Sequence, residues 1–301
     1  MYEIGHVTDE TYPGLLAHQA FVKRISELVT SPEAIAAGCD WEILRYDESE
    51  YRRLFLRGSG MTREEEIFVV LYTEQNPSAD VYGLVIAGAL GFLESEENVG
   101  GQPGAQLVMS PLHNTRIDYW VAFNGQRIAG AMKVGTPVYT SFYAGKINPY
   151  CLPHQWPYPL AVVGMTNSVV RFSDTTQTMG YGGYSFTSSL TNLKLYTPGM
   201  GWLFTGTPSG ARIYTTPYNN SLVASGVRDA EGVYSLFPIE VCPYYSNSYQ
   251  GGAWGAFDGI FAITGFNNAV ENTITINGTD YVVIQNAFRT GMNSYYAMRL
   301  D

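Results

Sequence analysis

Charged residues are scarce in this chain of 301 residues: Asp, Glu, Lys and Arg make up only 15%, whereas 46% of the residues are hydrophobic. Soluble domains usually carry about 25% charged residues, so much of this surface must consist of uncharged polar groups, glycine, tyrosine or apolar atoms. A surface of this kind tends to associate when it is left bare. We therefore expect partner proteins to cover part of it.

Basic residues are few, 17 against 27 acidic ones, and the imbalance lies in one part of the chain. Residues 1–100 hold 18 acids and 7 bases, whereas residues 101–301 hold 9 acids and 10 bases. Nucleic-acid binding needs Lys and Arg at the phosphates. The acidic segment therefore argues against direct contact with DNA or RNA, and the two segments are expected to have different neighbours.

Cysteine and histidine are too sparse to predict a metal centre or a disulfide framework. Cys39, Cys151 and Cys242 form no Cys-x-x-Cys pair, and the four histidines have no ligand spacing. No Gly-x-Ser-x-Gly sequence is present, and Gly58-Ser59-Gly60 lacks the Lys-Ser/Thr pair of a phosphate-binding loop, so it predicts a plain turn. The sequence therefore predicts no catalytic residue, no cofactor and no metal.

Long hydrophobic runs are also absent. The longest, Val81–Leu93, is broken by three glycines and is too short to span a bilayer. The first residues, Met1–His6, have neither the basic nor the apolar region of a secretory signal. No membrane association is expected.

Glycine and tyrosine, in contrast, are abundant, with 32 and 23 residues. This composition favours strands joined by tight turns. Residues 1–98 predict an acidic α+β domain, in which a helix over Tyr12–Thr30, with Pro13 in its first turn, covers a small antiparallel sheet. A second short helix is expected to end at Ala37, before Gly38. The expected strands of this domain are Trp41–Tyr46, Arg53–Leu56, Glu66–Tyr72 and Val81–Phe92.

Residues 99–301 predict a larger, Tyr/Gly-rich β domain. Asn124-Gly125 and Asn277-Gly278 each lie between two strand patterns, which is the strongest short-range signal of a hairpin. The expected strands are Ile117–Phe123, Arg127–Val134, Thr136–Ile147, Leu160–Val163, Phe257–Ile263, Asn272–Ile276, Tyr281–Ile284 and Tyr295–Leu300. Shorter strands are expected at Leu193–Tyr196, Ala211–Thr215 and Val233–Val241, between loops rich in Gly, Ser and Asn. The predicted fold class is therefore mainly β, an N-terminal α+β unit followed by an antiparallel, β-sandwich-like domain.

Two groups of residues are candidates for contacts with partners. Aromatic residues cluster in loops, where they favour a subunit interface over a sugar-stacking platform; packing on a sheet face is the structural alternative. The acidic cluster before the third strand is either a solvated turn or a contact for a basic patch on a neighbour. The interface candidates are Tyr143, Tyr150, Trp156, Tyr158, Tyr244, Tyr245, Glu64, Glu65 and Glu66.

Several segments together carry a family resemblance. The most specific are Tyr143–Gly145, Pro149-Tyr150 and Gln155–Gly164. The others are Trp41–Tyr46, Leu54–Gly60, Glu65–Phe68, Ile117–Arg127, Tyr281–Gly291 and Ala297–Asp301. These segments cover less than half of the chain and are similar to stretches of structural proteins from tailed-bacteriophage virions.

The resemblance implies a late virion component that has no catalytic residues and is assembled in the bacterial cytoplasm. The N-terminal helix and sheet resemble those of tail-terminator and tail-completion proteins, which favours a neck, collar or tail-end ring. The expected partners are other copies of the chain in a ring and other tail, neck or baseplate proteins. A host-surface or glycan-binding module of the tail tip or baseplate is the alternative, and a wall hydrolase with two close carboxylates is a third.

Overall fold

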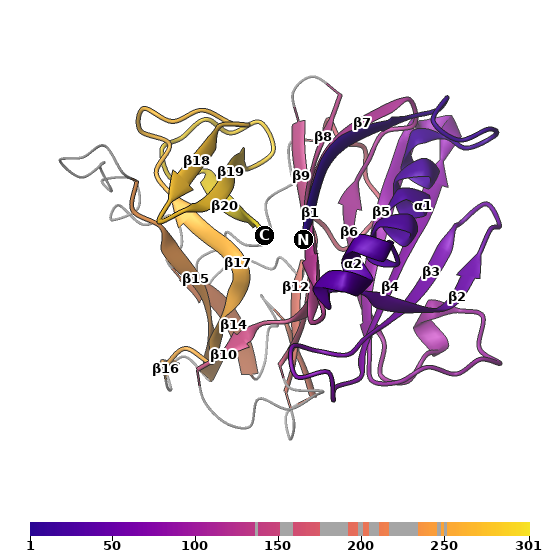
Figure 1. The fold of residues 1–301 in the computed structure, drawn as a ribbon, viewed down its shortest axis with the longest axis horizontal. Helices are drawn as coiled ribbons and strands as arrows, with labels where there is room; N and C mark the ends of the chain where they lie inside the picture. Colours follow the sequence, from indigo (N-terminus) through magenta and orange to yellow (C-terminus); the bar gives the residue numbers. More distant parts are fainter. Residues whose placement is uncertain are drawn as a thin grey trace.

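The computed structural model describes residues 1–135, 138–150, 159–174, 192–197, 201–204, 211–216, 234–245, 248–249 and 252–301. The chain is mainly β, as predicted, with a short helical part near the N-terminus (Figure 1). The helical elements are α1 (Ala17–Val29), α2 (Pro32–Ala37) and the single 3-10 turns η1 (Pro77–Ala79) and η2 (Val99–Gly101).

The smaller sheet has five antiparallel strands in the order β2-β3-β4-β5-β6. Its strands are β2 (Trp41–Asp47), β3 (Arg53–Gly58), β4 (Ile67–Asn76), β5 (Val81–Ala89) and β6 (Gln106–Pro111). Four of them were predicted from their alternating or apolar patterns. The sequence did not predict β6, because this short segment ends in proline and becomes a strand only by pairing with β5.

The longer sheet follows the order β1-β7-β8-β9-β11-β12-β13-β14-β15-β17-β20-β19-β18, with β10 beside β17 and β16 beside β15. Its pairs are antiparallel except for β13 and β14. The first strands are β1 (Tyr2–Thr8), β7 (Arg116–Asn124), β8 (Arg127–Val134), β9 (Val138–Lys146), β10 (Asn148–Pro149), β11 (Leu160–Val163) and β12 (Leu193–Thr197). The others are β13 (Gly201–Phe204), β14 (Ala211–Thr216), β15 (Phe237–Tyr245), β16 (Ser248–Tyr249), β17 (Gly255–Ile263), β18 (Thr273–Ile276), β19 (Thr279–Gln285) and β20 (Tyr295–Leu300).

The long sheet folds back so that its last strands pack on its first ones (Figure 1). On one face of β9, the ring of Tyr143 lies 5.1 Å from that of Phe257 in β17. On the other side, β9 contacts β4, β5 and β6 of the smaller sheet. Every residue of β9 is buried, since it lies between two layers. This layered arrangement is the sandwich-like architecture that the sequence predicts.

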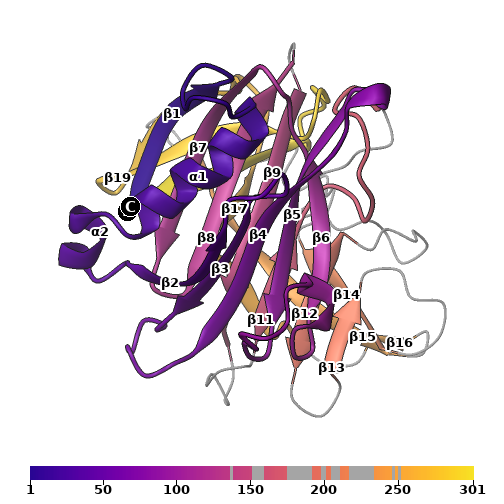
Figure 2. The ribbon, with the colours of Figure 1, turned by 90° about the vertical axis from the view of Figure 1, so that its right-hand side faces the viewer.

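Helix α1 lies between the two sheets, in contact with β1 and β7 of one and with β4 and β5 of the other (Figure 2). Its buried stripe includes Phe21, Val22 and Ile25. The helix begins five residues later than predicted, because Gly14 adopts φ +76° and Leu16 is still extended. Pro13 therefore lies before the helix, and the Gln19 side chain accepts a hydrogen bond from the Leu16 amide at 3.0 Å.

Both predicted hairpins are confirmed. β18 and β19 are joined through Asn277 and Gly278, whose φ angles of 52° and 78° are those that a type I′ turn requires. In the first hairpin, Asn124 pairs with Arg127, so the two loop residues are Gly125 and Gln126, one position later than Asn-Gly.

Strand pairs cross the expected domain boundary at residue 98. β1 pairs with β7 along its whole length, and β6 completes the sheet that β5 begins. Residues of both parts, such as Val69 and Phe142, also belong to one hydrophobic core. Separate folding of residues 1–98 and 99–301 stays a prediction.

Candidate functional site

The acidic cluster Glu64–Glu66 lies directly before β4, and its three side chains have different surroundings. Glu64 is exposed, whereas Glu66 forms an ion pair with Arg57 at 3.1 Å. Glu65 forms an ion pair with Lys146 at the end of β9, and both side chains are largely buried. The ion pair of Glu65 therefore connects the smaller sheet with the longer one. Glu64 and Glu66 remain candidates for contacts with a partner.

The same cluster contributes to a polar pocket of about 410 Å³. Its lining residues are Asp40, Glu42, Arg57, Ser59, Arg63, Glu64, Glu65 and Glu66. The two arginines are already paired, Arg57 with Glu42 and Glu66 and Arg63 with Asp40 at 3.1 Å. The acidic residues of this pocket are thus partly neutralised within the chain.

The glycine-rich loop Gly58–Gly60 packs against the turn of the first hairpin. The Gly60 amide donates to the Gly125 carbonyl at 2.8 Å, and a Cβ atom on Gly58 or Gly125 would lie 2.8 Å from a backbone oxygen. Glycine is needed here because two backbones approach closely. The turn itself lies slightly later than predicted, at Met61-Thr62, because Gly58 is still part of β3. The glycines serve the packing of one sheet on the other.

The aromatic interface candidates fall into three groups. Tyr143 is fully buried, and its hydroxyl donates to the Lys146 carbonyl. It belongs to the core, and its prediction as an interface residue is wrong, because β9 is covered on both faces. Tyr150 is 53% exposed, and its amide donates to the Trp254 carbonyl at 2.8 Å. Trp156 and Tyr158, and the side chains of Tyr244 and Tyr245, lie outside the described residues.

A buried charge cluster that the sequence did not predict joins β8 to β17. Arg127 Nε lies 3.2 Å from Asp258 Oδ2, and Arg299 binds the other carboxylate oxygen at 3.2 Å. Asn124 and Asn148 also donate to Asp258, at 2.7 and 3.2 Å. Burial raises the pKa of Asp258, but Arg127 and these hydrogen bonds outweigh it and hold the pKa below its usual range. The sequence feature that could have indicated this cluster is Asp258 itself, a single charged residue within the otherwise apolar segment Phe257–Ile263.

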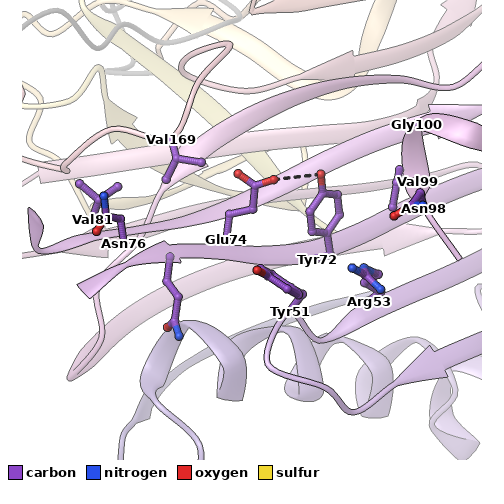
Figure 3. A pocket seen from close by; sticks show the side chains of 11 residues that line it. Tyr51, Arg53, Tyr72, Glu74, Asn76, Val81, Asn98, Val99, Gly100 and Val169 are labelled. Atoms are coloured by element: carbon purple, nitrogen blue, oxygen red, sulfur yellow. Dashed lines mark hydrogen bonds between the residues drawn. The ribbon is translucent and has the colours of Figure 1, made fainter. Parts of the chain in front are cut away.

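A second concave site lies on the outer face of the smaller sheet, the face turned away from β9. Its lining side chains are drawn in Figure 3. It encloses about 580 Å³. Its wall is formed by β3, β4 and β5, by η2 and the residue before it, by the turn before β3 and by the segment after β11. The lining residues are Tyr51, Arg53, Tyr72, Glu74, Gln75, Asn76, Val81, Asn98, Val99, Gly100 and Val169.

The alternation of β4 places Tyr72, Glu74 and Asn76 on this outer face. The Tyr72 hydroxyl donates to Glu74 Oε1 at 3.3 Å. Burial, followed by the neighbouring carboxylate, raises the pKa of Tyr72, so its hydroxyl stays protonated and available for hydrogen bonding. Arg53 lies beside Tyr51, with its guanidinium carbon 5.3 Å from the ring centroid. We call this site the outer-face pocket.

His113 and Asp118, a histidine and a carboxylate close together in the sequence, each have a partner of their own. His113 Nδ1 accepts a hydrogen bond from the Thr115 amide at 3.1 Å, and Asp118 is paired with Arg116 at 2.7 Å. Within the described part of the chain, no three His, Cys, Asp or Glu side chains are grouped closely enough to hold a metal ion. None of the described helices is both long and apolar enough to cross a bilayer.

In a comparison with known proteins, no protein-family model and no curated protein matches this chain.

Proposed function

We propose that this chain is a non-enzymatic structural component of a tailed-bacteriophage virion, and that it forms part of a neck, collar or tail-end ring. The proposal rests on the resemblance of the segments around residues 143–164 and 281–301 to virion proteins. The partners would be further copies of the chain and other tail, neck or baseplate proteins, and the chain would reside in the virion.

The edge of the long sheet supports assembly. β1 is the first strand of this sheet, and among the described residues no strand pairs with its outer edge. Tyr2 and Ile4 on this strand are 47% and 50% exposed. An unpaired edge strand with apolar side chains is a template for pairing with another chain. The opposite edge, β18, has a different sequence, so contact between the two edges would be heterologous, which is the type of contact that closes into rings.

The exposed residues of the acidic cluster, Glu64 and Glu66, also support this proposal. Glu64 and Glu66 are exposed at the wall of the partly neutralised polar pocket, and they would meet a basic patch on a neighbour. The exposed Tyr150 would contribute a contact from the other domain.

The decisive experiment is localisation of the chain in intact particles by electron microscopy, with an antibody or a small tag as the label. We expect density at the neck, the collar or a tail end, repeated around the tail axis. Absence of the chain from purified virions would contradict the proposal.

The alternative, a host-surface or glycan-binding module, is favoured by one observation, the outer-face pocket with its tyrosines and amides. That site is argued separately below, since a structural protein can also carry a binding site.

A further inference from the structure

We propose that the outer-face pocket binds an uncharged saccharide. The site is independent of the aromatic loops considered from the sequence, and it does not depend on the position of the chain in a particle. Its volume of about 580 Å³ lies within the range of roughly 300–1,000 Å³ found for ligand sites. This space is sufficient for one or two sugar rings.

The charges of the pocket select against anionic ligands. Arg53 is the one cationic side chain of the lining, and it is already paired with Asp47 at 3.2 Å. Glu74 contributes a carboxylate, so phosphate, a nucleotide or an acidic sugar would meet repulsion that no unpaired cation of the lining offsets. A neutral ligand avoids this cost.

The polar groups of the pocket are those that bind hydroxyl groups. The described residues engage only one of the two carboxylate oxygens of Glu74, so the second can accept a hydrogen bond from a ligand. The side-chain amide of Asn98 supplies donors and an acceptor at the wall. That of Asn76 supplies donors, because its oxygen already accepts from the Ser78 hydroxyl at 2.7 Å. These groups would be left unpaired by a hydrocarbon or lipid chain, which makes an apolar ligand unfavourable.

The apolar surfaces are arranged for the carbon–hydrogen face of a sugar. Tyr51 is 41% exposed at the rim of the pocket, next to Arg53 (Figure 3). Val81 and Val169 add apolar surface on the same side of the sheet. A ligand that is polar around its edge and apolar on its face matches this combination, and sugars have both properties.

Gly100 provides a means of closing the pocket without disturbing the fold. A Cβ atom at this position would meet no atom within 4 Å, and its φ is not in the left-handed region. A larger side chain can therefore occupy the open space of the site. Gly100→Leu is expected to fold normally and to obstruct the ligand.

The test uses the full chain and five probes: maltotriose, cellotriose, triacetylchitotriose, 3′-sialyllactose and inorganic phosphate. Saturation-transfer NMR would detect binding, and isothermal titration calorimetry would measure it. We expect at least one neutral trisaccharide to bind with a Kd of about 0.1–10 mM, as is reasonable for a small open site. We expect sialyllactose and phosphate to bind at least about tenfold more weakly.

Tyr51→Ala and Gly100→Leu should each weaken the binding at least about tenfold. Phe266→Ala is the matched control, because Phe266 is 43% exposed, close to the value for Tyr51, but lies in the loop after β17, outside the pocket. Its affinity should equal that of the wild type. The inference is overturned if none of the neutral sugars binds, if an anionic probe binds best, or if binding survives both pocket substitutions. The localisation experiment is unaffected by any of these results.

Discussion

His18 illustrates how a single buried side chain makes the stability depend on pH. It lies in the first turn of α1, fully buried, with its ring 5.0 Å from that of Tyr82. Burial lowers the pKa of His18 from 6.5 to about 4. Between pH 6.5 and about 4, His18 binds a proton in the unfolded chain but not in the folded chain. Stability from this residue is therefore present at neutral pH and is lost as the pH falls from about 6.5 to 4.

We expect this loss to reach about 3 kcal/mol of unfolding free energy at pH 4. Chemical denaturation at pH 7, 5.5 and 4 measures it, and the His18→Leu variant serves as the reference. The difference in unfolding free energy between the two proteins reports the contribution of His18 alone, because the carboxylates that titrate in the same pH range are present in both. Parallel pH profiles for the two proteins would contradict the prediction.

Asp258 is the residue on which the buried charge cluster depends. We expect Asp258→Asn to destabilise the fold by about 3–5 kcal/mol, because Arg127 is then left buried without its full counter-charge. Asp118→Asn is the control, since it breaks a more exposed pair with Arg116, and its cost should be below about 1 kcal/mol. Urea denaturation measures both. If the two substitutions lowered the unfolding free energy equally, burial of Asp258 would not explain the cost of replacing it.

At the scale of elements, the hairpin of β18 and β19 depends on its turn. Gly278 has φ 78°, and a Cβ atom there would meet nothing within 4 Å. Any cost of Gly278→Ala is thus conformational, and we expect about 1 kcal/mol. Gly100→Ala also adds a Cβ atom in open space but without a left-handed φ, so it should lie within about 0.5 kcal/mol of the wild type. Thermal denaturation of both variants tests the comparison.

Elements were predicted best where the signal was local. β11 and β20 begin and end at the predicted residues, and α2 ends at Ala37 before a left-handed Gly38. The start of α1 was predicted too early, since the apolar spacing continues through Leu15 although Gly14 ends the preceding turn. β1 was not predicted at all, because it is a strand only through its pairing with β7, more than 100 residues away.

At the scale of the whole molecule, the outer edge of β1 is expected to mediate association. Ile4→Glu places a charge on this edge and should shift the chain from oligomer toward monomer. Leu93→Glu is the control, as Leu93 is 48% exposed but lies in the loop after β5. Analytical ultracentrifugation over a range of concentrations measures the change. The role of the β1 edge in association is contradicted if the wild type is monomeric at every concentration, or if both variants dissociate to the same extent.

The mainly β character of the chain, most of its strands and both hairpins could be predicted from the sequence, because strand alternation and glycine-containing turns act over a few residues. The burial of Tyr143, the largely buried position of Glu65, the contact of Arg127 with Asp258 and the pocket on the outer face of the smaller sheet became evident only in the folded chain. These features join residues far apart in the chain, such as Glu65 with Lys146. Which such residues meet depends on how the sheets pack, and local patterns carry no information about that packing.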